Sequence, residues 1–203
     1  MSCQGSKLDL CIAQGKTFAM TLRWAAEPYI YRPITTIHNS APLRAEVIGH
    51  GMPDGWMFAF SAIQGPVDLN AQMSPPGPDD YRQAKVIGPD EIEVNAINGA
   101  LLKPYRSGGF IQYLTPVSLA GKSARMDIRD KVGGNLLLSL HSGDDSIVLD
   151  DTEKTISLRL EHDITRDIAW RRGVHEIEIF DAVDVFRLAY GAVTVSPETT
   201  TSE

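Results

Sequence analysis

The chain has 203 residues, of which 43% are hydrophobic and 22% charged, a composition typical of globular proteins and sufficient for one large or two small domains. Its formal net charge of −7 argues against a nucleic-acid partner, because phosphate binding requires clustered Lys and Arg side chains. We expect no membrane association, since no segment approaches the roughly 20 consecutive apolar residues of a membrane span. No secretory signal is visible, which predicts folding in a cytosol.

The N-terminal region contains the two cysteines and the first apolar pattern. Cys3 and Cys11 belong to no Cys-x-x-Cys or Cys/His ligand set, so we predict two free thiols and no zinc site. Apolar residues alternate over residues 8–12 and again over 18–24, with a Gln-Gly-Lys turn between. This pattern predicts a β-hairpin whose two apolar faces lie on the same side, with Cys11 on the polar side.

The central stretch has a different sequence pattern, with short apolar runs separated by many Gly and Pro residues. Pro28 and Pro33 end the first pattern, and Tyr29 and Tyr31 between them are expected to pack at a junction. The density of turns after residue 33 predicts a small β-barrel or sandwich. Strands are expected at residues 43–48, 56–63, 81–87, 91–94 and 110–114, including a hairpin across Gly88-Pro-Asp90.

The strand at residues 124–129 has the clearest pattern, because Ala124, Met126 and Ile128 alternate with charged residues. We expect it to resume a sandwich that the central stretch interrupts. The predicted domains are a sandwich of residues 1–32 and 116–203 and an inserted small β-domain of residues 33–115. The predicted inward residues are Met126, Ile128, Leu158, Ile177 and Leu188, and the predicted outward residues are Arg125, Arg129 and Arg159.

The C-terminal third predicts more strands and one helix. Strands are expected at residues 136–140, 147–149, 156–160, 174–180, 185–190 and 192–195. Asp163 is expected to cap a short helix that carries Ile164 and Ile168 and ends near Gly173. The predicted fold class is therefore all-β: a discontinuous β-sandwich, an inserted small barrel-like β-domain and one short helix.

Carboxylates and histidines are the candidate chemical groups. Asp144, Asp145, Asp150 and Asp151 form the densest acidic group, and calcium prefers several oxygen ligands. Their spacing matches no metal loop, and aspartate is common in turns, so we favour turns over a calcium site. The histidines show no repeated spacing; they are His38, His50, His141, His162 and His175. The chain lacks a Gly-x-Ser-x-Gly elbow, although a Ser-His-Asp site converges only in space.

Two further groups have a structural and a functional interpretation. Arg171-Arg172 is interpreted as a solvated helix end, placed favourably for the helix dipole. Asn95 to Asn98, together with the aromatic residues Trp56, Phe58 and Phe60, could line a sugar site. We favour the core interpretation, since these three aromatic residues alternate as a buried face does. The sequence thus predicts no catalytic residue, no cofactor-binding residue, no metal ligand and no cofactor, and we do not expect an enzyme.

The flanks of the central stretch resemble a protein type from tailed-phage structural modules. The pattern Leu-x-Ile-x-x-Gly-x-Thr-Phe runs from Leu10 to Phe18, and Pro-Val-x-Leu-x-Gly-x-x-Ala-Arg-Met-x-Ile-Arg-Asp runs from Pro116 to Asp130. A closing pattern, Gly-x-Val-x-Val-Ser-Pro-Glu-x-Thr, begins at Gly191. This looks like the N-terminal β-sandwich of phage baseplate upper proteins, which anchors receptor-binding parts to the tail. The resemblance covers most of residues 1–32 and 116–203.

The central stretch is similar to the small β-domain called the first catalytic cysteine half-domain in ubiquitin-activating enzymes, which recurs in phage virion proteins. In phage proteins this domain implies no ubiquitin chemistry, and neither cysteine of this chain lies in the insert. The matching stretches are Ile34-Thr-Thr-Ile37, Gly49-His-Gly51, Leu69-Asn70, Tyr81 with Val86, Asp90-Glu-Ile-Glu-Val-Asn95 and Tyr105-Arg-Ser-Gly-Gly109.

These resemblances lead to one functional expectation and two alternatives. We expect a tail or baseplate adaptor of a tailed-phage virion that anchors fibres or other tail proteins and is assembled in the host cytoplasm. Its expected partners are other phage tail proteins, copies of itself and tail fibres, with no nucleic acid and no membrane. The alternatives are a glycan-binding adhesion module on the virion surface and a head or collar accessory protein.

Overall fold

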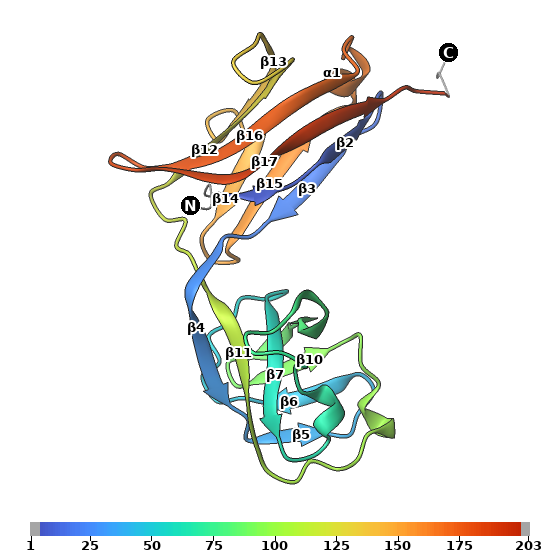
Figure 1. Ribbon diagram of the computed structural model, residues 1–203, viewed down its shortest axis with the longest axis vertical. Coiled ribbons are helices and arrows are strands. Elements are labelled where there is room, and N and C mark those ends of the chain that lie inside the picture. The colour runs from blue at the N-terminus through green and yellow to red at the C-terminus, as the bar shows by residue number, and fades with distance from the viewer. Residues whose placement is uncertain (1–4, 200–203) are drawn as a thin grey trace. The chain divides into compact units, whose positions relative to one another are not determined.

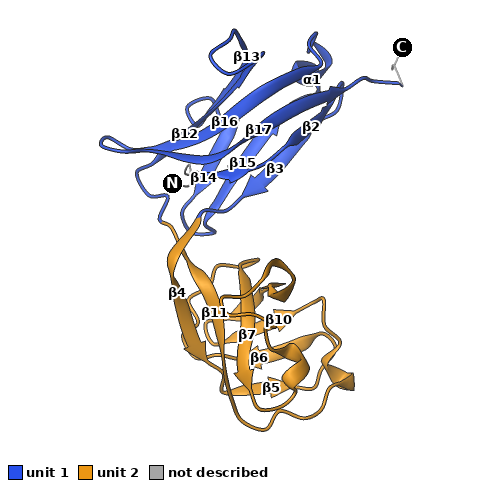
Figure 2. Cartoon of the chain, in the orientation of Figure 1, with its two compact units in different colours: residues 1–24, 118–203 blue, residues 25–117 orange. Residues whose placement is uncertain are grey.

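The computed structural model describes residues 5–199, and these form an all-β fold with one short α-helix (Figure 1). The described residues fall into four sheets and two compact units. One unit comprises residues 1–24 and 118–203, and the other comprises residues 25–117 (Figure 2). No helix among the described residues is long and apolar enough to cross a membrane.

The first unit is a β-sandwich built from segments at both ends of the chain. Its six-stranded sheet has the order β1-β17-β16-β12-β13, with β2 also paired to β17, and its three-stranded sheet has the order β14-β15-β3. The bounds are β1 Ser6–Lys7, β2 Leu10–Ala13, β3 Phe18–Leu22, β12 Ser123–Arg129, β13 Leu136–His141, β14 Ile147–Asp150, β15 Thr155–Leu160, α1 His162–Arg166, β16 Arg172–Phe180 and β17 Val185–Ser196.

The faces of β12 follow the predicted alternation. Met126 and Ile128 are fully buried between the sheets, and they pair with Ile177 and His175 of β16 in an antiparallel ladder. Leu158 and Ile177 are also buried, and Leu188 packs half-buried against the same core. Arg125 and Arg159 are exposed and Arg129 is half-buried. The predicted inward and outward faces of these strands are therefore confirmed.

The predicted N-terminal hairpin is wrong, although both of its strands exist. Strand β2 pairs in parallel with β17, whereas β3 pairs antiparallel with β15 in the other sheet. The turn between them is an arch that crosses from one sheet to the other. Gln14 donates its side-chain amide to the Arg166 and Ile168 carbonyl oxygens, at 3.1 and 3.0 Å, which ties the arch to the segment after β15. Both apolar faces still enter one core, from opposite sides.

Two details of the C-terminal prediction also differ. The segment from 192 to 195 is not a separate strand but the end of the twelve-residue β17, because Gly191 continues the ladder opposite His175. The N-cap position of helix α1 is Glu161 rather than Asp163, without a side-chain cap hydrogen bond, and the helix ends at Arg166. Arg171 and Arg172 therefore do not form a helix end, since Arg172 begins β16 and Arg171 donates to the Gln14 side chain at 3.3 Å.

The second unit has its own core between two four-stranded sheets, ordered β4-β11-β7-β8 and β5-β6-β10-β9. The strands predicted at 43–48, 56–63, 91–94 and 110–114 are present, and the expected hairpin across Gly88-Pro-Asp90 is β9–β10. The single strand predicted at 81–87 is wrong, because this segment is divided into β8, which pairs with β7 in one sheet, and β9, which pairs with β10 in the other. The bounds are β4 Ala25–Pro33, β5 Thr36–His38, β6 Leu43–Glu46, β7 Met57–Ile63, β8 Arg82–Gln83, β9 Lys85–Gly88, β10 Glu91–Val94 and β11 Gly108–Pro116, with 3₁₀ helices at Val67–Leu69, Pro78–Asp80 and Gly99–Leu101.

The insert starts eight residues earlier than predicted, because the segment with Pro28 and Pro33 is a strand rather than a junction. Strand β4 is at the edge of its sheet and pairs with β11 from Pro33 opposite Phe110 to Ala25 opposite Pro116. A register shift opposite Leu114 and Thr115 leaves Pro28 outside the regular ladder, and edges and bulges are where a strand tolerates proline. The start and the end of the insert consequently lie side by side.

Truncating Ile128 to Ala should lower the free energy of unfolding by about 2–5 kcal/mol, because it removes buried methyl groups and leaves a cavity. Arg129→Ala should cost less than about 1 kcal/mol, since the partly exposed Arg129 pairs with Asp127 near the surface. Urea unfolding of both variants measures the difference. Equal losses would contradict the assigned faces of β12.

Deleting residues 25–117 and joining Trp24 to Ser118 through a short Gly-Ser linker should leave a folded sandwich. The two ends of the insert are opposite each other in the β4–β11 ladder, so the linker needs to span only a cross-strand distance of about 5 Å. Calorimetry should show one cooperative transition for the shortened protein and another for the isolated 25–117 segment. Loss of cooperative melting in both would contradict the division into two units.

Candidate interaction surfaces

The outer face of the six-stranded sheet of the sandwich unit holds a concave surface, a groove of about 1060 Å³. We call it the sheet groove. It crosses strands β1, β12, β13, β16 and β17 and is lined mainly by charged and polar side chains. Its charged lining residues are Lys7, Asp9, Arg125, Asp127, Arg129, Glu176, Glu178 and Arg187.

The charges of the sheet groove form ion pairs with one another. Arg125 and Glu178 are opposite in the β12–β16 ladder, and their Nε and Oε2 atoms are 2.6 Å apart. Asp127 and Glu176 are also opposite, and this pair of like charges is compensated by arginines. Arg129 Nη2 is 2.8 Å from Asp127 and Arg187 Nη2 is 2.9 Å from Glu176. Partly exposed ion pairs of this kind contribute at most about 1 kcal/mol each to the free energy of folding. They therefore determine the charge pattern of this surface more than they stabilise the fold.

Asp127 of β12 and Ser139 and His141 of β13 meet in the sheet groove. The Ser139 hydroxyl donates to Asp127 Oδ1 at 2.7 Å, and Ser139 Oγ is 3.1 Å from His141 Nε2. A hydrolase triad places His between Ser and Asp, whereas here Ser lies between Asp and His. Because the only hydroxyl proton of Ser139 is given to Asp127, the imidazole donates to Ser139 and does not act as its base. Burial raises the pKa of Asp127, but the hydrogen bonds from Ser139 and Arg129 outweigh it, and the net pKa is lowered.

His175 lies beneath the same sheet, on the core side of β16. Its Nε2 donates to the Leu8 carbonyl oxygen at 2.7 Å, between β1 and β2, while its buried Nδ1 has no hydrogen-bond partner among the described residues. Burial lowers the pKa of His175, partly opposed by the Leu8 hydrogen bond. Gly191, opposite His175 in the ladder, permits this packing because a Cβ there would collide with the Leu8 carbonyl.

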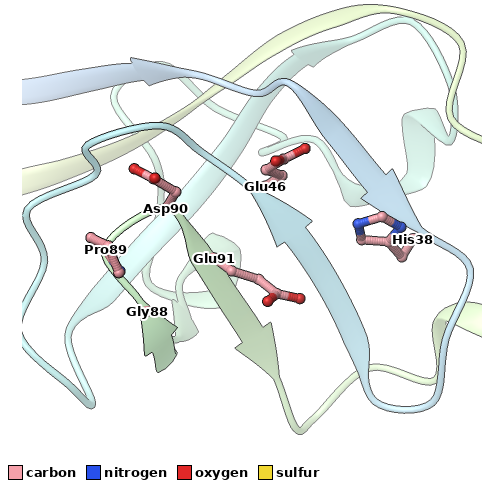
Figure 3. Close-up of a pocket in the computed structure, with 6 residues that line it drawn as sticks. All are labelled: His38, Glu46, Gly88, Pro89, Asp90 and Glu91. Carbon is pink, nitrogen blue, oxygen red and sulfur yellow. The ribbon is translucent and has the colours of Figure 1, made fainter.

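The inserted unit has a smaller opening of about 400 Å³ on the outer face of the β5-β6-β10-β9 sheet. It is lined by His38, Glu46, Glu91 and the β9–β10 turn, and the Asp90 carboxylate points away from His38 (Figure 3). Glu46 and Glu91 are opposite each other across β6 and β10. Among residues 5–199 no group of three or more His, Cys, Asp or Glu side chains is arranged to hold a metal ion.

Of the four candidate calcium aspartates, Asp144, Asp145 and Asp151 lie in turns of the sandwich unit and Asp150 is the last residue of β14. Three of the four accept hydrogen bonds from neighbouring residues. Asp144 accepts from the Ser146 amide at 3.0 Å, and Asp150 accepts from the amides of Thr152 and Glu153. Asp151 accepts from the Leu119 amide and from Lys154 at 2.6 Å each, and these bonds, led by that from Lys154, lower its pKa to about 2.

The residues considered for a sugar site are placed as the core interpretation predicts. Trp56, Phe58 and Phe60 are buried in the core of the inserted unit, and Asn98 caps the third 3₁₀ helix through its side chain. Cys11 is a free, exposed thiol on the polar side of β2 as predicted, while Cys3 lies outside the described residues.

Sequence reasoning missed an aromatic group on the outer face of the β4-β11-β7-β8 sheet. The rings of Tyr31 and Phe110 are 5.3 Å apart in an edge-to-face contact, and Tyr29 lies 6.4 Å from Tyr31. Tyr29 and Tyr81 share a hydrogen bond of 2.9 Å between their hydroxyls, and burial followed by this bond raises the pKa of Tyr81 to about 12. Tyr31 remains 54% exposed. Recognising β4 as a strand would have revealed the group, because Tyr29 and Tyr31 are two residues apart.

No protein-family model matches the sequence, and no curated protein matches it.

The lowered pKa of His175 predicts a pH-dependent stability. The unfolded imidazole takes up its proton near pH 6.5 and the folded one only at lower pH, so the free energy of unfolding should fall as pH drops below about 6.5. Urea unfolding at pH 7.5, 6.5 and 5.5 measures this loss. His175→Gln keeps a donor for the Leu8 carbonyl but cannot be protonated, so its stability should vary less. The same pH slope in both proteins would contradict the assignment.

Proposed function

We propose that this protein is a structural component of a tailed-phage virion, a tail or baseplate adaptor that anchors fibres or other tail proteins. One observation carries the proposal. The three sequence stretches that resemble the baseplate sandwich lie far apart in the chain, but they form the arch from β2 to β3, the strand β12 and the end of β17, all in one core. Residues Leu10 to Ala13 pair directly with Val193 to Ser196. The resemblance therefore follows one folded unit.

The separate core of the insert supports different roles for the two units of such an adaptor. The insert has its own hydrophobic core, and its ends are adjacent in the β4–β11 ladder. A unit attached in this way can vary or bind separately while the host domain keeps its fold. We assign anchoring to the sandwich and contact with a further tail protein or fibre to the insert.

The proposed partners are other tail proteins, copies of this chain and tail fibres, in a virion assembled in the host cytoplasm. The protein acts by binding, and no catalytic step is proposed for it. The sheet groove fits this role, because its arginines and carboxylates are already arranged in pairs. A partner with the opposite pattern can exchange these pairs for intermolecular ones, which gives register and specificity more than affinity.

Glycan binding is the second candidate function, and the aromatic group of the insert favours it. Exposed aromatic rings such as Tyr31 offer an apolar face to a sugar ring, and Phe110 holds Tyr31 in place. In this role the protein would serve adhesion on the virion surface. A position at the head or collar is a further placement of the same structural role.

Omitting the gene from the phage genome should give particles with incomplete tails or missing fibres and with DNA packaging intact. Electron microscopy and DNA content measure the two effects, and the wild-type gene supplied in trans should restore the particles. Normal particles that adsorb normally would contradict the structural role. Tyr31→Ala separates the candidates: normal morphology with lost adsorption to host cells would favour the glycan-binding module.

A further inference from the structure

Strand β13 is an edge of the six-stranded sheet and carries no charged residue or proline. It is the last strand on one side of that sheet, and its sequence, Leu136-Leu-Leu-Ser-Leu-His141, contains no Lys, Arg, Asp, Glu or Pro. Natural sheets block open edges with charges, prolines or very short strands. Leu136 is 51% exposed, and Val132, in the turn before it, is 90% exposed. An edge with this composition favours pairing with another strand.

Most other sheet edges of the described chain carry such protection. The edge strand β4 contains two prolines, β5 and β8 have three and two residues, β9 contains Lys85, and β14 ends in Asp150. The five-residue β3 is also uncharged, but Lys16 and Arg23 flank it, and the Lys16 carbonyl accepts from Thr165 at 2.7 Å. Strand β13 is thus the longest uncharged edge in residues 5–199.

The backbone of β13 directs Ser139 to the open side. The Ser142 amide donates to the Ala124 carbonyl of β12 at 3.0 Å. In an antiparallel strand the backbone amides and carbonyls of alternate residues point to the same neighbouring strand. The backbone groups of Leu140 and Leu138 therefore also point to β12. His141 points outward, and its amide and carbonyl are already bonded to the Ser146 hydroxyl at 2.8 and 3.2 Å. The amide and carbonyl of Ser139 are left facing the open edge.

We propose that β13 pairs antiparallel with β13 of a second copy of this chain, about a two-fold axis at Ser139. In this register the two Ser139 residues exchange both backbone hydrogen bonds, and Leu138 lies opposite Leu140 of the second copy, both on the core face. An uncharged strand can face itself without opposing like charges, which is why the second copy fits. The pairing joins two sheets into one. This proposal rests on the proposed function in one respect, because it assumes that copies of the protein assemble with one another.

Sedimentation equilibrium of the full chain tests the interface directly. At concentrations up to about 200 μM, which suffice for a dimer of micromolar Kd, the wild type should populate a dimer. Ser139→Lys places two like charges at the two-fold axis and should raise the Kd at least tenfold. The matched control is Ser157→Lys, because Ser157 lies on β15, which is paired on both sides. A wild type that stays monomeric, or a dimer that Ser139→Lys leaves unchanged, would overturn the proposal.

Two further variants keep the test decisive if Ser139→Lys alters the fold. Ser139→Glu should also dissociate the dimer, and an equimolar mixture of the Lys and Glu variants should form a heterodimer, because opposite charges then meet at the axis. A thermal melt confirms that each variant is folded. Two folded variants that remain monomeric on mixing would argue against an axis at Ser139.

Disulfide formation reports the register independently. In a Cys3→Ser, Cys11→Ser background, Ser139→Cys should form a disulfide-linked dimer under mild oxidation, since paired Cα atoms lie within bonding reach. Thr21→Cys, on the uncharged edge β3, is the control. Cross-linking of Thr21→Cys but not of Ser139→Cys would transfer the interface to β3 and overturn the proposal. These outcomes concern the edge alone, whereas particles lacking the gene judge the proposed function.

Discussion

The sandwich depends on one core that closes only when distant segments of the chain meet in space. Met126 and Ile128 of β12 belong to the same buried cluster as Ile12 of β2 and Leu158 of the three-stranded sheet. Burying a side chain of this size contributes about 1.5–3 kcal/mol relative to exposure. Since the sheets share this core, the N-terminal strands cannot bury their apolar faces until β15, β16 and β17 are in place. The host domain is therefore a single unit despite its interrupted sequence.

The insert is compatible with this dependence because it enters and leaves through one pair of neighbouring strands. The β4–β11 ladder lies within the insert, and the insert core uses no residue of the sandwich core. The two units therefore bury separate hydrophobic cores. Tyr31 and Phe110 on the insert and the paired charges on the sandwich provide two surfaces of different chemistry.

The polar face of the sandwich shows how proximity differs from a reactive arrangement. Asp127, Ser139 and His141 are brought together from two strands, yet the order of their hydrogen bonds places the hydroxyl between the carboxylate and the imidazole. Ser139 thereby fixes Asp127, and Asp127 in turn holds Arg129. The backbone amide and carbonyl of Ser139 also face the open edge of the sheet. A single position thus joins the charged face to the edge proposed for pairing.

The sequence by itself determined the strands whose alternation is local, such as β12, β15, β16 and the β9–β10 hairpin, and it determined that Trp56, Phe58 and Phe60 belong to a core. Only the tertiary structure decided which strands pair. The turn at Gly15 joins β2 to β3 without pairing them, because β2 finds a parallel partner about 180 residues away in β17. The prolines of β4 likewise indicated a junction until the ladder with β11 placed them at an edge and a bulge. The sheet groove, the aromatic group and the open edge of β13 could not be predicted from the sequence, because each of them depends on which strands are neighbours. A period of two tells which face of a strand is buried, but the neighbour that covers it is chosen by contacts across the whole chain.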